Sequence, residues 1–261
     1  MSVKSGQDQY LIGVSVLAFL FNLLFVLTTW PMGSMPSLGN HEFARMVFAL
    51  RTPLNLLLGA GFIVLLIVNI VRSKRLRWIA HPLLTLALLA SLAIGWAFDA
   101  NHIFRTLHGP NMVAADTVKL PPDVPLLSVT MDGVSHAYPL QYLAYHHLIS
   151  DRVGDQQLDV TYCFLVDSVS TFVHDPGISL ELVAARGNNS IYRDVETGSW
   201  WQQETGQSIA GERAGAVLQT VDAERLTFSE WRERYPQGRI MQPEPVYQPL
   251  YGQFFPSLWP E

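Results

Sequence analysis

The stretch YLIGVSVLAFLFNLLFVLTTW, residues 10–30, decides the fold of the first part of this 261-residue chain. It contains no Asp, Glu, Lys or Arg, and it has the length of about 20 residues that a helix needs to cross a bilayer. Two similar runs follow at 53–71 and 78–98. The sequence therefore predicts a three-helix membrane anchor over residues 1–98. The first run is too long for the apolar part of a cleaved signal peptide, so we expect it to be retained.

The loops between these runs predict the orientation of the anchor. The segment RSKRLR, residues 72–77, carries four basic residues, whereas residues 31–52 carry only Arg45 and Arg51, partly offset by Glu42. Basic loops stay on the cytoplasmic side of a membrane. We therefore expect a protein of the bacterial inner (cytoplasmic) membrane, with its N-terminus in the cytoplasm and residues 99–261 in the periplasm or outside the cell.

Charge is distributed very unevenly between the two parts of the chain. Residues 1–98 hold seven Lys and Arg against two Asp and Glu, a net charge of +5, while residues 99–261 hold ten against twenty, a net charge of −10. A nucleic-acid-binding surface is basic. The acidic second part therefore excludes nucleic acid as an expected partner, and the membrane remains the expected surroundings of the first part.

The second part divides into three segments. Residues 99–124 contain Gly and Pro without a periodic pattern, so we predict a linker. Residues 125–242 alternate short apolar segments with turn residues, which predicts an extracytoplasmic α+β domain with a mainly antiparallel sheet. The pair Asp132-Gly133 predicts a hairpin turn. We expect a helix over 140–150 and strands over 158–165, 168–174 and 179–185.

The tail, residues 243–261, has an unusual composition. It contains five Pro and five aromatic residues, so it cannot form a regular helix and is too aromatic for an ordinary flexible terminus. We expect it to lie extended against its own domain or against a partner.

Four motifs carry a resemblance to a known family. They are GVSHAYPLQYLAYHHLISDRVG at 133–154, VTYCFLVDS at 160–168, NNSIYRDVETGSWWQQETGQSIAG at 188–211 and EWRERYP at 230–236. In this order and spacing they resemble the prokaryotic family called domain of unknown function 3179, over residues 125 to 241. The resemblance implies a fold neighbourhood and candidate positions, and it implies no particular reaction.

The resemblance also suggests a metal site. Family members usually have T-Y-C-x-x-C-G-S where this chain has TYCFLVDS, so Cys163 matches the first cysteine while Val166 and Asp167 replace the second cysteine and the glycine. Members usually have W-H-E where this chain has YHH, so His146 matches the histidine and His147 replaces the acidic residue. Thiolate and imidazole groups suit copper or zinc. The candidate ligands are Cys163, His146, Asp167 and His147.

The only cysteine has a second interpretation. Because the chain has one cysteine, Cys163 cannot form an internal disulfide, and a cysteine in a strand is often a small buried apolar residue. His136 and His174 lie at strand positions and are weaker candidates for a site.

Amides, an aromatic ring and a carboxylate gather in the third motif. Such groups near a turn can line a pocket for a polar ligand, or they can form a turn network that fixes the fold. The candidate ligand-binding residues are Asn188, Asn189, Asp194, Trp201 and Gln203.

Two main classes of function remain after the motifs are considered, and a domain that binds a polar ligand is a weaker third. The chain has no HExxH, no Walker loop, no GxSxG and no dinucleotide-binding glycine motif, which weighs against metalloprotease, nucleotide and hydrolase chemistry. The first class is a membrane-anchored copper, zinc or redox protein. The second is a non-catalytic accessory or assembly subunit that holds a membrane-protein partner through its helices and tail. The motifs do not decide whether the domain catalyses a reaction.

Overall fold

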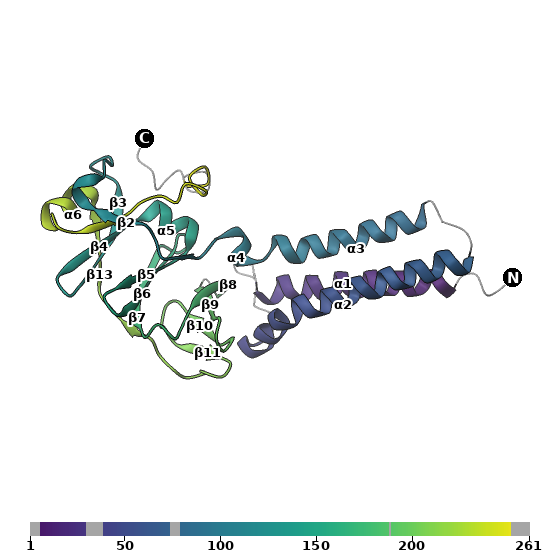
Figure 1. Ribbon diagram of the computed structural model, residues 1–261. Coiled ribbons are helices and arrows are strands. Elements are labelled where there is room, and N and C mark those ends of the chain that lie inside the picture. The colour runs from purple at the N-terminus through teal and green to yellow at the C-terminus, as the bar shows by residue number, and fades with distance from the viewer. Residues whose placement is uncertain (1–5, 30–38, 74–78, 188, 252–261) are drawn as a thin grey trace. The chain divides into compact units, whose positions relative to one another are not determined.

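The computed structural model describes residues 6–29, 39–73, 79–187 and 189–251 and divides the chain into two units (Figure 1). The first unit comprises residues 1–103 together with 185–187, and the second comprises the remaining residues. Apart from residues 185–187, the first unit is mainly helical over its described residues. The second combines short helices with three β-sheets, as expected for an α+β region.

Three long helices form the first unit. Each is long and apolar enough to cross a membrane, which confirms the expected number of spans. Helix α1 packs along both of the others (Figure 1), and Leu11, Phe62 and Leu88 are buried between them. Helix α2 begins twelve residues before the predicted run at residue 53, and a short helix α4 follows α3. The bounds are α1 Gly6–Thr29, α2 His41–Ser73, α3 Ala80–Ala97 and α4 Ala100–Ile103.

A polar cluster joins the three helices. The amide of Asn22 on α1 donates to Asn55 Oδ1 at 3.1 Å and to Ser91 Oγ at 3.2 Å, and Asn55 donates back to Asn22 Oδ1 at 3.1 Å. A Cβ added at Gly95 of α3 would collide with the side-chain amide of Asn22, so glycine at residue 95 allows α3 to lie against the Asn22 side chain. Polar side chains that bond across helices stabilise membrane bundles.

The second unit holds three sheets. Their strand orders are β1-β5-β6-β7-β12, β11-β10-β9-β8 and β13-β3-β4-β14-β2. Only the β1/β5 and β14/β4 pairs are parallel, so the sheets are mainly antiparallel, as predicted. The strands are β1 Leu107–His108, β2 Met112–Ala114, β3 Pro125–Met131, β4 Val134–Pro139, β5 Leu148–Val153, β6 Gln156–Cys163, β7 Ser168–His174, β8 Leu180–Arg186, β9 Asn189–Asp194, β10 Trp200–Gln202, β11 Ser208–Ala210, β12 Gln219–Thr220, β13 Ala223–Thr227 and β14 Arg239–Met241. The helices are η1 Ala115–Thr117, α5 Leu140–His146 and α6 Phe228–Arg234.

Two apolar clusters form the core of the second unit. In one, Leu143 of α5 packs with Ile149 of β5 and Val160 of β6. In the other, Trp231 of α6 packs on Leu126 of β3. The two clusters fix α5 and α6 to their sheets and so position the family motifs.

Local signals in the sequence were confirmed in several places. Asp132 and Gly133 have φ of 50° and 78° and form the predicted hairpin turn between β3 and β4. The predicted strand over 168–174 is β7, and the strands predicted over 158–165 and 179–185 are shifted by one or two residues in β6 and β8.

The helix predicted over 140–150 is too long. Helix α5 ends at His146, because His147 adopts the left-handed conformation that terminates a helix, and β5 begins at Leu148. Leu148 and Ile149 then pair with Thr161 and Val160 of β6. Sheet pairing outweighs the helical spacing of the apolar residues here.

The segments expected as linker and tail contribute to the second unit. Residues 99–124, expected as a linker, contain β1 and β2, which pair with β5 and β14. In the tail, the backbone of residues 244–251 forms turns, and Tyr251 packs against Tyr142 of α5. Residues 252–261 lie outside the described residues.

Candidate functional site

His146 uses both of its ring nitrogens within the protein. Nδ1 must donate to the carbonyl of Arg105, 2.5 Å away, because a carbonyl can only accept. Nε2 therefore accepts from the Tyr251 hydroxyl at 2.7 Å. Burial lowers the pKa of His146 to about 4, although its bond to the Arg105 backbone acts in the opposite direction. The imidazole is neutral at physiological pH and held in one tautomer.

His147 has a different environment from its neighbour. Its φ is 57°, and its carbonyl accepts from the Tyr162 backbone amide and the Tyr192 hydroxyl, both at 3.1 Å. The ring is 3 % exposed and lies 4.3 Å from the Phe104 ring and 5.3 Å from the Phe164 ring, measured between centroids.

The two ring nitrogens of His147 have no hydrogen-bond partner among the described residues. Burial, with a smaller contribution from His146, lowers the pKa of His147 to about 3. Buried polar atoms without partners are destabilising and are uncommon in native proteins. His147 is therefore the more unusual of the two histidines, a distinction that the sequence did not reveal.

Cys163 ends strand β6 opposite Ser168 of β7 and is 5 % exposed. Its chain neighbours Tyr162 and Phe164 both contact His147, the first through its backbone amide and the second through its ring. The structure therefore brings the end of α5 to the cysteine turn, and the residue that contacts both neighbours of the cysteine is His147.

Asp167 forms an ion pair at the surface. Arg225 of β13 donates to its two carboxylate oxygens at 3.0 and 2.8 Å, and Tyr162 donates to it at 3.0 Å. The hydrogen bonds from Arg225 hold the pKa of this carboxyl below its usual value. Asp167 has φ of 50°, a conformation that glycine adopts without strain, and the family pattern has glycine at this position.

The four candidate metal ligands do not form one cluster. Within the described ranges, no group of three or more His, Cys, Asp or Glu side chains could hold a metal ion. The polar atoms of His146 and Asp167 already have protein partners. Of the other two candidates, Cys163 is a buried thiol outside any disulfide, and His147 has no hydrogen-bond partner at either ring nitrogen among the described residues.

Asp194 organises a turn within the second set of candidates. Its fully buried carboxylate accepts from the Thr197 amide at 2.6 Å, the Thr197 hydroxyl at 2.7 Å and the Trp201 indole at 3.4 Å. Arg213 Nε lies 3.1 Å from the same carboxylate. The partners of Asp194 are those expected for a structural turn.

Asn189 and Gln203 also contact their own chain. Asn189 donates to Glu204 Oε2 at 3.0 Å and accepts from the Glu204 amide at 3.3 Å. Gln203 donates to the Ser168 carbonyl at 3.2 Å, while its Oε1 is buried without a partner among the described residues. Asn188 lies outside the described residues.

Two buried aspartates were not anticipated. Asp151 accepts from Tyr138 at 2.7 Å and lies 2.7 Å from His136 Nδ1. Asp159 accepts from Ser150 and lies 2.9 Å from His174 Nε2. In the second group the serine and the histidine both bond to the carboxylate and not to each other, so the serine is not activated as in a hydrolase triad.

The pKa of His174 reflects its bond to Asp159. Burial lowers this pKa, but the hydrogen bond and the charge of Asp159, together with Asp175, outweigh burial and raise it. Both ring nitrogens face acceptor atoms, the second being the carbonyl of Asp175 at 2.9 Å. Both contacts favour the protonated form more than water around a free imidazole does. Ser150 pairs with Asp159 and Asp151 pairs with Leu158, so alternation along β5 and β6 places the two aspartates on opposite faces of the sheet.

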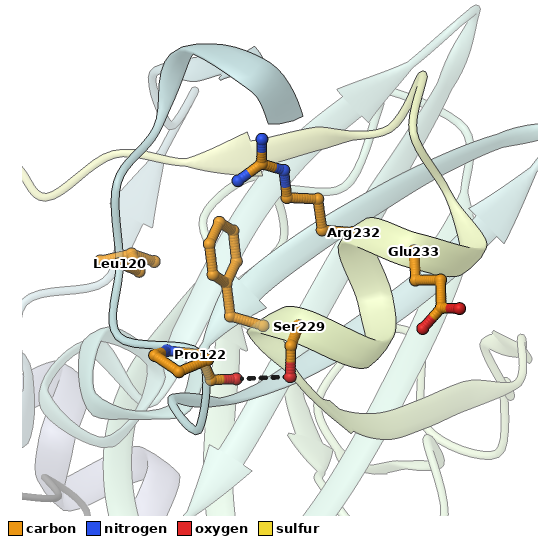
Figure 2. A pocket seen from close by; sticks show the side chains of 6 residues that line it. Leu120, Pro122, Ser229, Arg232 and Glu233 are labelled. Carbon is orange, nitrogen blue, oxygen red and sulfur yellow. Dashed lines mark hydrogen bonds between the residues drawn. The ribbon is translucent and has the colours of Figure 1, made fainter.

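A pocket of about 410 Å³ lies beside α6, and Arg232 and Glu233 of the motif at 230–236 contribute to its lining (Figure 2). Figure 2 shows Leu120 and Pro122 on one side and Arg232 on the other, with Ser229 donating to the Pro122 carbonyl at 2.9 Å. The lining residues are Leu120, Pro122, Phe228, Ser229, Arg232 and Glu233. The pocket is apolar at Phe228 and charged at Arg232 and Glu233.

These features define a class of protein: three helices able to cross a membrane, followed by an α+β domain of mainly antiparallel sheets. The chain belongs to the family described as Protein of unknown function (DUF3179), whose match covers residues 105–255, more than half of its length. Comparisons with curated proteins and with solved structures gave no significant match. The family match includes β1 and β2, in agreement with their pairing into the sheets.

Proposed function

We propose that this chain is a membrane-anchored accessory subunit whose extracytoplasmic domain is a non-catalytic scaffold. The observation that carries the proposal is the use of both nitrogens of His146, by the Arg105 carbonyl and by the Tyr251 hydroxyl. The histidine that matches the family pattern therefore contributes to the internal structure of the domain.

The other candidate positions support the same interpretation. Asp167 is neutralised by Arg225, and Asp194 is surrounded by donors from its own turn. The three helices expose large apolar side chains such as Leu56 and Leu57, which can contact lipid or the helices of a partner. An anchor of this kind suits a subunit that assembles with another membrane protein.

The test is purification of the tagged full chain in a mild detergent, followed by quantification of co-purifying proteins. We expect at least one membrane protein at a fixed ratio to the chain. A matched control replaces residues 1–98 by three helices of an unrelated membrane protein and should lose this partner. Recovery of the chain alone, with copper or zinc bound at a fixed ratio, would contradict the proposal.

A soft-metal function is the second candidate, and one observation favours it. The two nitrogens of His147 are buried without partners, and His147 contacts both chain neighbours of Cys163. Thiolate and imidazole ligands suit copper or zinc. Two ligands from one chain hold a metal weakly, so this function needs a further ligand from water or from a partner.

Metal content distinguishes the two candidates. If the soft-metal function is correct, the copper or zinc content per chain should fall about tenfold or more in Cys163→Ser and in His147→Asn. Asparagine tolerates the left-handed backbone conformation of residue 147, so the fold should be preserved. His108→Gln, at an exposed histidine, is the control and should retain the metal.

A further inference from the structure

Tyr251 packs against aromatic rings of α5, and the space that its ring occupies is called the pocket below. Its ring centroid is 4.7 Å from that of Tyr142, and 5.6 Å from those of Tyr145 and His146. The ring of Tyr247 covers the same surface, 5.4 Å from Tyr145 and 5.2 Å from His146. The phenol ring of Tyr251 is therefore in contact with rings from three residues of one short helix.

The pocket also has a fixed polar group. Because Nδ1 of His146 donates to the Arg105 carbonyl, Nε2 can only accept, and it accepts from the Tyr251 hydroxyl at 2.7 Å. Burial raises the pKa of Tyr251, so its hydroxyl keeps the proton that it donates. Aromatic walls and one fixed acceptor match an aromatic ring that carries a hydroxyl group.

The segment that supplies Tyr251 is attached mainly through side chains. Backbone hydrogen bonds of residues 244–251 run within the segment among the described residues, for example from Leu250 to Tyr247 at 2.8 Å. Just before this segment, the backbone amide of Gln242 donates to the Asn111 carbonyl at 2.9 Å, which connects the chain to the sheets. The segment can therefore leave α5 without breaking a strand pairing.

We infer that the pocket formed by Tyr142, Tyr145 and His146 is a binding site for a small phenolic molecule, and that Tyr251 is a built-in occupant which this ligand displaces. The ligand class follows from the group that fills the site in this chain, a phenol whose hydroxyl donates to His146 Nε2. Because Tyr251 competes with the ligand for the site, the apparent Kd of the ligand equals its intrinsic Kd divided by the fraction of molecules in which Tyr251 has left the site.

Binding of p-cresol, which is the tyrosine side chain as a free molecule, tests the inference on the full chain in detergent. Tyr251→Ala should bind p-cresol, and should bind toluene about tenfold more weakly because toluene lacks the hydroxyl donor. Tyr251→Phe is the matched control, since its ring still fills the pocket, and it should bind p-cresol at least about tenfold more weakly than Tyr251→Ala. Equal affinity of Tyr251→Ala for p-cresol and toluene would overturn the inference.

A second measurement on the unmutated chain does not depend on the folding of a variant. With fluorine-labelled tyrosine, the resonance of Tyr251 should move to that of a mobile, exposed ring as p-cresol is added. Hydroquinone should act in the same way, and toluene at the same concentration should not. A Tyr251 resonance that stays unchanged up to the solubility limit of p-cresol would show that this side chain is a fixed part of the core.

Discussion

His146 and His147 are adjacent in the sequence and have opposite hydrogen-bonding environments. The first has a partner at each ring nitrogen, and the second has none among the described residues. The difference arises because the helix ends between them, so that His147 turns away in the left-handed conformation toward Phe104 and Phe164. Both rings are buried as neutral groups, which makes protonation unfavourable in the folded state.

The first prediction concerns acid stability. The pKa values of about 4 and about 3 for His146 and His147 lie below the unfolded value of 6.5, so the unfolded chain binds more protons between these limits. Stability should therefore fall as pH decreases below 6.5, by about 1.4 kcal/mol per pH unit for each histidine. Urea unfolding of the protein between pH 7 and pH 5 measures this slope.

Two variants separate the histidine contribution from the general effect of acid. His147→Phe removes one titrating group and should roughly halve the slope, whereas His108→Phe, at an exposed position, should leave it unchanged. Identical slopes in the unmutated chain and in His147→Phe would mean that His147 is not buried as a neutral ring.

The second prediction concerns the ion pair between Asp167 and Arg225. Both side chains are substantially exposed, so Asp167→Asn and Arg225→Gln should each lower the free energy of unfolding by at most about 1 kcal/mol. Because both substitutions remove the same interaction, the double variant should lose less free energy of unfolding than the sum of the losses in the two single variants. Urea unfolding of the four proteins measures the coupling, and strictly additive losses would show that the pair contributes nothing.

At the scale of the elements, close approach of α3 to α1 depends on Gly95 and Asn22. We predict that Gly95→Ala lowers stability in detergent by about 1–2 kcal/mol, because the new methyl group displaces Asn22 from Asn55 and Ser91. Gly59→Ala on α2 is the matched control, since no atom lies within 4 Å of its added Cβ. Thermal melting of the two variants decides the matter: equal melting temperatures would show that the Asn22 cluster does not hold the helices.

The elements also show what could be predicted from the sequence. The three long helices, the Asp132-Gly133 turn and β7 follow from composition and local spacing, which act over a few residues. Strands β1 and β2 were missed because two or three residues carry no periodic signal.

The candidate site was predicted less well than the fold, for a physical reason. The resemblance pointed to Cys163 and His146, and both lie in the second unit at the ends of β6 and α5. The partner of His146 is Tyr251, 105 residues away, and a contact at that separation has no local pattern. The left-handed conformation of His147, which brings that residue to the neighbours of Cys163, is likewise set by sheet pairing.

At the scale of the whole molecule, the two parts of the chain carry charge of opposite sign, +5 over residues 1–98 and −10 over residues 99–261. A membrane protein keeps its basic segments in the cytoplasm, and the most basic segment here is residues 72–77, which begins at the end of α2 and precedes α3. If all three candidate spans cross the membrane, we expect the C-terminal domain on the opposite side from this segment.

The last prediction tests this orientation with a reporter enzyme that is active only in the cytoplasm. Fused after Arg75 it should be active, and fused after Glu261 it should be inactive, because an odd number of spans separates the N-terminus from the domain. Replacing the four basic residues of 72–77 by glutamine should weaken the preference and give mixed activity at both positions. A reporter that is active after Glu261 and inactive after Arg75 would reverse the orientation, and the domain would then lie in the cytoplasm. Because thiols stay reduced there, Cys163 would not be expected to form a disulfide with another chain.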